Sequence, residues 1–199
     1  MSYAIIGFGK IGHALANAFA RKGIEVSVAT TRDPESFAAD AAAIGPTIIP
    51  KTLTDAVRAD VIFLAVRFES HLEVAKALQA WKGKTIIDVT NAYGISPEDL
   101  GGEPSSRVVA QAFVGARLVK GFNHLGATVL GQDSVVQGGR RVVFLASDDA
   151  TAAKEVGSLA DSLGFAPIEL GSLSEGGLLV QARGNRWGEL IFKDLVKFD

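Results

Sequence analysis

The sequence predicts an α/β fold in which a doubly wound parallel sheet is followed by a small C-terminal α/β extension. Short β-branched runs alternate with helical patterns over most of the chain, and this alternation implies right-handed crossovers between parallel strands. The runs are continuously apolar, as in VIFLAV at residues 61–66, rather than alternating with polar residues. Continuous apolar runs are typical of strands that are buried on both faces of a sheet.

The elements follow one another in a regular order. Apolar, β-branched runs predict the strands, apolar residues at helical spacing predict the helices, and Pro34 stands near a first turn, where proline is tolerated. Up to residue 137 the chain is expected to run as strand Ser2–Ile6, helix Lys10–Lys22, strand Ile24–Ala29, helix Pro34–Ala43, strand Thr47–Ile49, helix Asp55–Arg58, strand Val61–Val66, helix Ser70–Trp81, strand Thr85–Val89, helix Ser105–Phe113 and strand Leu118–Phe122.

A turn at Gln137-Gly138-Gly139 predicts a domain boundary near residue 137. Beyond it the pattern predicts strand Arg141–Ala146, helix Ala150–Leu163, strand Ala166–Leu170, and a mostly helical stretch from Ser172 with breaks at Gly176-Gly177 and Gly184. Residues 138–199 are too few to be expected as an independent domain.

Composition excludes several classes of function. The 199 residues are 48% hydrophobic and 21% charged, and the net charge of −2 provides no basic field for nucleic acid or a membrane surface. The chain has no cysteine, which excludes disulfides, thiolate metal sites and a cysteine nucleophile. It has neither a signal-peptide pattern nor an apolar stretch of roughly 20 residues, so a cytoplasmic location is expected.

A glycine triplet follows the first predicted strand and opens the first predicted helix. The sequence Gly7-Phe8-Gly9-Lys10-Ile11-Gly12 fits G-x-G-x-x-G, and this context is typical of a Rossmann-type dinucleotide site. Gly7 allows a tight turn, Gly9 lets the backbone approach a pyrophosphate, and Gly12 lets the helix pack closely. The N–H groups at the start of the helix would then hold the anion.

The second predicted strand ends in Thr30-Thr31-Arg32, where NAD-binding units usually carry an acidic residue for the ribose hydroxyls. Hydroxyl groups followed by a guanidinium favour a 2′-phosphate instead, so the prediction is selection of NADP(H) over NAD(H). In the alternative interpretation Arg32 is a solvated surface residue, paired with Asp33 or Glu35.

Ligands of open α/β sheets lie at the carboxyl ends of the strands. Three segments leave predicted strands there and are expected near the nicotinamide half of the cofactor: Val66-Arg67-Phe68, Thr90-Asn91-Ala92 and Asn123-His124-Leu125. Asn91 and Asn123 are expected to bind the carboxamide or the ribose, or alternatively to make turns. His124 is the candidate proton donor, with a structural histidine as the alternative. The three histidines lack zinc-ligand spacing, so no metal site is expected.

Seven segments in order, GFGKIG, TTR, FLAV, IIDVTNA, LVKGFNHL, RVVFLASDD and LGFAPIELG, resemble the NADPH-dependent coenzyme F420 (deazaflavin) reductase family. The resemblance covers nearly the whole chain and implies a deazaflavin lying over the nicotinamide, in a cleft closed by the C-terminal part, and a homodimer. It assigns residues 7–12 to the phosphates, and Thr31 and Arg32 to the 2′-phosphate. It places Ala65 and Val66 beside the ribose, with Asn91, Ala92 and Asn123 in the neighbouring segments.

The sequence departs from that family at three positions. Arg67 and Ala92 stand where proline is frequent, and His124 stands where a small hydroxyl residue is common. In the C-terminal part, Trp187, Phe192 and Leu178-Leu179 form either an apolar wall for the acceptor or, as the preferred interpretation, part of the core.

The function predicted from these features is hydride transfer between NADPH and a small deazaflavin or flavin-like acceptor. Residues 1–137 are expected to bind NADP(H), and residues 138–199 to close the acceptor cleft. The alternatives are an NADPH-dependent imine or carbonyl reductase that uses His124 as its proton donor, and a non-catalytic module that senses NADP(H).

Overall fold

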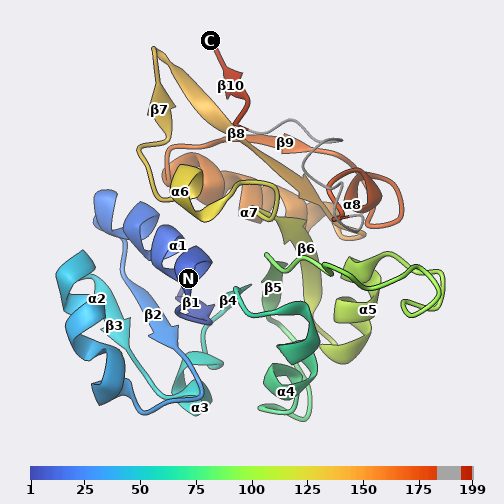
Figure 1. The fold of residues 1–199 in the computed structure, drawn as a ribbon, viewed down its shortest axis with the longest axis horizontal. Coiled ribbons are helices and arrows are strands. Elements are labelled where there is room, and N and C mark those ends of the chain that lie inside the picture. The colour runs from blue at the N-terminus through green and yellow to red at the C-terminus, as the bar shows by residue number, and fades with distance from the viewer. Residues whose placement is uncertain (183–193, 199) are drawn as a thin grey trace.

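The computed structural model describes residues 1–182 and 194–198, which build a single mixed sheet with helices on both faces (Figure 1). The strand order is β3-β2-β1-β4-β5-β6-β8-β10, with β7 and β9 also paired to β8. The strands are β1 (Tyr3–Ile6), β2 (Val26–Ala29), β3 (Ile48–Pro50), β4 (Val61–Leu64), β5 (Thr85–Asp88), β6 (Arg117–Gly121), β7 (Val135–Val136), β8 (Gly139–Ala146), β9 (Ala166–Glu169) and β10 (Val196–Lys197).

The first six strands are all parallel, which confirms the predicted doubly wound sheet. Residues of β2, β4 and β5 are buried throughout because helices cover both faces. The helices are α1 (Lys10–Arg21), η1 (Pro34–Phe37), α2 (Ala38–Ile44), α3 (Leu53–Ala56), η2 (Phe68–Ser70), α4 (His71–Ala75), α5 (Ser105–Ala112), α6 (Ala127–Leu130), α7 (Ala150–Ser162) and α8 (Gly176–Leu179).

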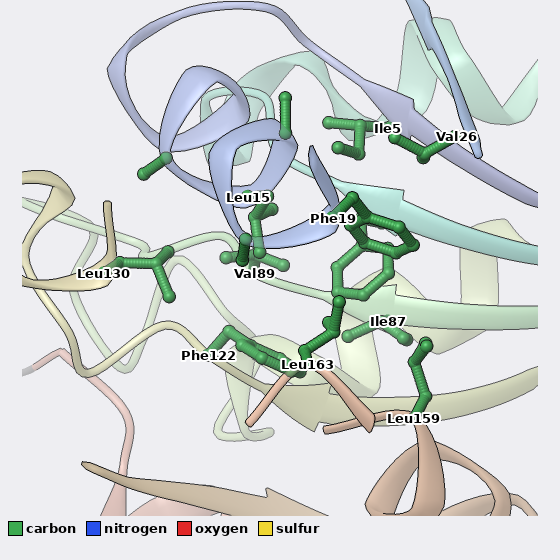
Figure 2. Close-up of a cluster of buried hydrophobic side chains, with 14 of the residues drawn as sticks. Ile5, Leu15, Phe19, Val26, Ile87, Val89, Phe122, Leu130, Leu159 and Leu163 are labelled. Carbon is green, nitrogen blue, oxygen red and sulfur yellow. The ribbon is translucent and has the colours of Figure 1, made fainter. Parts of the chain in front are cut away.

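Two hydrophobic clusters lie on opposite faces of the sheet. The cluster in Figure 2 packs Leu15 and Phe19 of α1 and Leu159 and Leu163 at the end of α7 against the strands. Phe122 lies in the same cluster and meets the edge of another buried ring, that of Phe165, at 5.8 Å. This continuous packing joins the C-terminal part to the parallel sheet.

The C-terminal strands change direction. β8 runs antiparallel to β6, with Lys120 opposite Ala146, while β9 is parallel to β8 and β10 is antiparallel to it. Asp149 is the N-cap of helix α7, and its carboxylate accepts a hydrogen bond from the Ala152 N–H at 2.9 Å. The predicted α/β extension is therefore present as an antiparallel continuation of the same sheet.

The helix predicted over Ser70–Trp81 is shorter, because α4 ends at Ala75. Trp81 is buried, its indole N–H donates to the Ala75 carbonyl at 3.0 Å, and its ring meets the edge of Phe113. Tertiary packing of this tryptophan thus replaces the last helical turns.

The prediction of a mostly helical C-terminus is wrong for the described part, where only α8 and strand β10 follow Ser172. Gly176 begins α8 rather than breaking a helix. A Cβ at this position would lie 2.4 Å from the Leu170 carbonyl oxygen, so only glycine fits there. Trp187 and Phe192, two of the proposed wall residues, lie outside the described residues. Over residues 1–182 and 194–198, no helix has the length and apolar character needed to cross a membrane.

Candidate functional site

The glycine turn connects β1 to α1, and two of its glycines leave no room for a side chain. Gly7 has φ of 101° and its N–H donates to the Ala29 carbonyl at 2.8 Å. A Cβ on Gly7 would lie 2.3 Å from the Ala65 carbonyl oxygen, and one on Gly12 would lie 2.0 Å from the Gly7 carbonyl oxygen. Gly7 and Gly12 therefore fix the close approach of β1, α1 and the end of β4.

Gly9 differs, because a Cβ there would meet no atom within 4 Å. It is the N-cap of α1 and provides no capping side chain, and the first turn carries no acidic residue. The first N–H groups of a helix have no acceptor within the helix, and the helix dipole makes this end attractive to anions. The start of α1 is thus open to an anionic group, with the exposed Lys10 beside it.

A cavity of about 720 Å³ adjoins this helix start at the carboxyl ends of β4 and β5. It brings together seven of the residues predicted from the sequence: Gly9, Lys10, Ile11, Ala65, Val66, Arg67 and Asn91. Phe68 and Thr90, which belong to the strand-end segments expected near the nicotinamide, also line it. The other lining residues, Glu69, Ser70, Val89 and Tyr93, were not predicted. All four lie within three residues of a predicted one, so the strand ends were the signal for the whole wall.

Thr30, Thr31 and Arg32 follow β2 and lie outside that cavity. The Thr30 hydroxyl accepts a hydrogen bond from the Arg32 N–H at 2.9 Å, which fixes the turn. The Arg32 guanidinium lies 5.8 Å from the ring centre of Phe37 and is exposed. Within the described part of the chain it makes no ion pair, so the alternative pairing with Asp33 or Glu35 is not formed.

Phe8, in the middle of the glycine turn, is buried and stacks on the ring of His13 at 3.9 Å. Its ring also lies 5.8 Å from that of Phe37, the residue beneath the Arg32 guanidinium. Phe8 therefore supports the turn and the Arg32 region from below rather than lining the cavity.

Asn91 and Asn123 bind each other where β5 and β6 end. The Asn91 amide donates to the Asn123 carbonyl at 2.9 Å, and the Asn123 amide donates to Asn91 Oδ1 at 3.0 Å and to the Val180 carbonyl at 2.7 Å. Asn123 is buried behind Asn91 and does not line the cavity. It holds Asn91 in place and links the cavity wall to the end of α8.

A buried ion pair underlies the same wall. Asp88 and Lys120 are opposite each other in the β5–β6 register, and their side chains meet at 3.0 Å. Lys120 also donates to the Thr90 carbonyl, while the other Asp88 oxygen accepts from the Thr90 N–H at 2.9 Å and hydroxyl at 2.7 Å. Burial lowers the pKa of Lys120, and the attraction of Asp88 offsets part of that effect. The pair fixes Thr90, which lines the cavity.

His124 and Ala92 are not brought to the cavity. His124 is 1% exposed, its Nε2 bonds the Val142 carbonyl at 3.1 Å, and burial lowers its pKa to about 4. Because the His124 ring is neutral at pH 7 and enclosed by the protein, it fits the role of a structural histidine better than that of a proton donor. Ala92 is buried in the hydrophobic cluster on the α4–α5 face. Tyr93, the next residue, lines the cavity instead, and partial burial raises its pKa.

No group of three or more metal-ligating side chains is found among the residues that the structure describes. Among the described residues, the cavity carries two cations, Lys10 and Arg67, and one carboxylate, Glu69. An open helix start, an arginine beyond β2 that has no ion pair with any described residue, and this excess of positive charge together suit a phosphate-bearing dinucleotide.

Comparison with known proteins supports this reading. Residues 2–92 match the family model described as "NADP oxidoreductase coenzyme F420-dependent". The crystal structure of the hypothetical protein SMa0349 from Sinorhizobium meliloti superposes with a TM-score of 0.91 and 36% identity, covering 99% of this chain and 96% of that one. A candidate F420-dependent NADP reductase from Arthrobacter sp. FB24 superposes with a TM-score of 0.68 and 25% identity, covering 87% and 86%.

Among curated proteins, the human Metalloreductase STEAP2 is 30% identical over 176 residues, which are 87% of this chain and 34% of that protein. The chain thus spans about a third of the length of the curated relatives it matches. Together, the match of residues 2–92, which include the glycine turn and the end of β4, and the likeness in fold show that the chain is similar to the coenzyme F420-dependent NADP oxidoreductases.

Proposed function

We propose that the protein is an NADP-dependent oxidoreductase that binds NADPH along the carboxyl edge of its sheet and passes hydride to a deazaflavin or flavin-like acceptor. The observation that carries the proposal is the exposed guanidinium of Arg32, unpaired among the described residues and close in sequence to the end of β2. The adenosine 2′-phosphate would bind this group, with the hydroxyl of Thr31 beside it. The pyrophosphate would bind the open start of α1 at Gly9 and Lys10.

The nicotinamide half would occupy the 720 Å³ cavity. Asn91 supports this placement, because its oxygen and one of its N–H groups are bonded to Asn123, and its second N–H has no partner in the described part of the chain. A fixed amide with one free N–H suits the carbonyl of a carboxamide. Ala65 and Val66 would lie beside the ribose, and Arg67 at the entrance.

When bound, NADPH would supply a hydride to the acceptor ring and become NADP⁺, and the accompanying proton would come from solvent. The protein's own part is to hold two rings in contact and to exclude water. The residues that line the cavity agree with a protein that positions the two rings and supplies no acid or base. None of the described residues around the cavity is a histidine, and its carboxylate, Glu69, is exposed.

Two alternatives differ in their chemistry. An imine or carbonyl reductase would need a proton donor, and the buried, neutral His124 weighs against it. A sensing module would bind NADPH in the same way without turning it over. A relative in sequence is named as a metalloreductase and a structural neighbour as an NADP reductase, so acceptors are expected to vary on a common nucleotide-binding half. A homodimer and a cytoplasmic location stay predictions from the sequence.

The first experiment replaces Arg32 with alanine and titrates NADPH and NADH. We expect the Kd for NADPH to rise by about 10- to 100-fold, as for loss of charge-assisted hydrogen bonds, while the Kd for NADH changes less than about twofold. Arg58→Ala is the matched control, because Arg58 is exposed and lies just before the opposite, amino end of β4. Equal losses for both nucleotides, or no loss, would show that Arg32 does not bind the 2′-phosphate.

The second experiment follows the absorbance of NADPH with a deazaflavin, with flavin mononucleotide and with a panel of imines. Oxidation with the ring acceptors alone is the expected result. Oxidation only with imines would favour the imine reductase, and tight binding without any oxidation would favour the sensing module. Either result would contradict the proposed acceptor.

A further inference from the structure

A second cavity, of about 640 Å³, lies on the other side of the start of α1. It is a groove between α1 and α6, which pack side by side, and it shares Gly9 and Lys10 with the first cavity. The two cavities therefore meet at the glycine turn. In the placement proposed above, the 2′-phosphate binds at Arg32, the pyrophosphate at Gly9 and Lys10, and the nicotinamide in the first cavity. The dinucleotide therefore meets the groove only at its two shared residues and leaves the rest of it free.

The floor of the groove is made of small residues. Ala14 of α1 faces Ala127 and Gly131 at the two ends of α6. A Cβ on Gly131 would lie 3.2 Å from the Ala127 carbonyl oxygen and 3.5 Å from the Ala14 Cβ, so the two helices approach closely here. The Gly131 carbonyl is also held, by a hydrogen bond of 2.7 Å from Arg21. The floor thus consists of small residues on two closely packed helices.

The walls of the groove carry polar groups whose orientation is fixed by other bonds. Gln132 Oε1 accepts from Arg141 at 3.0 Å, which leaves its NH₂ group as a donor. His13 Nδ1 lies 3.0 Å from the Gly9 carbonyl, which can only accept, so Nδ1 carries a proton and Nε2 is the ring nitrogen that remains for a ligand. The Asn17 amide donates to the His13 carbonyl at 2.8 Å, which leaves Oδ1 as an acceptor.

The groove therefore offers both donors and acceptors, and Thr128 adds a hydroxyl that can act as either. No carboxylate lines it among the residues that the structure describes. The adjacent acid, Asp133, is engaged by the Val135 N–H at 3.0 Å. Hydroxyl groups, which donate and accept at once, match such a mixed set better than a purely anionic or purely apolar ligand does.

We infer that this α1–α6 groove binds the polyhydroxyl side chain of a flavin-type acceptor whose ring lies against the nicotinamide in the first cavity. The inference rests on the proposed function, because it takes the acceptor to be a ring compound. It adds a second contact region, which makes the side chain of the acceptor, and not only its ring, a determinant of binding.

Riboflavin and lumiflavin test the inference, because they share the tricyclic ring and only riboflavin carries a ribityl chain. Binding is measured by quenching of flavin fluorescence, with and without NADP⁺. We expect the wild-type protein to bind riboflavin about tenfold more tightly than lumiflavin, the ratio that one or two net hydrogen bonds provide. Gln132→Ala and Thr128→Val should each lower this ratio several-fold without changing the Kd for NADPH.

Gln111→Ala is the matched control, because Gln111 is an exposed glutamine on α5 that lines neither cavity. It should leave the ratio unchanged. Equal affinity for the two flavins in the wild-type protein, or a ratio unaffected by the Gln132 and Thr128 substitutions, would overturn the groove assignment. A separate titration of NADPH decides the proposed function itself: absence of NADPH binding would refute that proposal, while the flavin ratio without nucleotide would still decide the groove.

Discussion

Lys120→Met removes one partner of the buried ion pair beneath the cavity wall. At 3.0 Å, Coulomb's law with an effective dielectric constant of ~20 gives an attraction of about 5.5 kcal/mol between Lys120 and Asp88. The cost of burying the charges offsets part of it in the wild-type protein, but the variant leaves the carboxylate buried without its cation. The two bonds from Thr90 to Asp88 remain, so we expect the lower part of the usual range, about 3 kcal/mol of unfolding free energy.

This loss should appear in urea unfolding as a lower midpoint without a change in slope. The variant should also bind NADPH about tenfold more weakly, because the Thr90 carbonyl loses its donor and the turn that carries Asn91 is held less firmly. Adding Asp88→Leu should restore much of the stability, since an apolar pair can replace a buried ion pair. It should not restore the affinity, because Thr90 then loses its remaining side-chain partner.

Arg117→Met is the control, since Arg117 lies at the start of the same strand and pairs with Glu155 at a half-buried site. It should cost about 1 kcal/mol or less and leave the Kd for NADPH unchanged. The reasoning would be refuted if Lys120→Met cost less than about 1 kcal/mol. It would also be refuted if Lys120→Met lost stability but bound NADPH like the wild-type protein.

The glycines and His124 give further predictions. Gly12→Ala should cost about 3 kcal/mol in urea unfolding, because its Cβ would meet the Gly7 carbonyl, whereas Gly9→Ala should cost less than about 1 kcal/mol and yet weaken NADPH binding more than tenfold in calorimetry. Similar stability losses in the two variants would contradict this contrast. His124 takes up a proton near pH 6.5 when unfolded but only near pH 4 when folded, so the wild-type protein should lose about 3 kcal/mol as the pH falls from 6.5 to 4. His124→Gln should flatten that pH dependence and leave NADPH oxidation at pH 7 unchanged, and a collapse of turnover would restore His124 as a proton donor.

Local sequence patterns predicted the parallel part of the sheet and the glycine turn beside the first cavity, because each of these depends on residues that are close in sequence. Gly7, Gly9 and Gly12 act within one turn of the chain. The apolar runs of the strands can be recognised without knowing which strands lie beside them. The Asp88–Lys120 pair was not predicted, since it depends on the register between two strands whose residues lie 32 positions apart. The choice of Tyr93 over Ala92 for the cavity wall depends on the direction in which the chain leaves β5, which the sequence pattern does not determine.

The reversed direction of β8 has a consequence for how the polypeptide can be divided. β6 pairs with β5 on one side and with β8 on the other, so a fragment that stops at residue 137 would expose a row of unpaired backbone groups along β6. Such a fragment is expected to self-associate through that open edge. Studies of the nucleotide-binding half alone would therefore need a substitute strand supplied in trans.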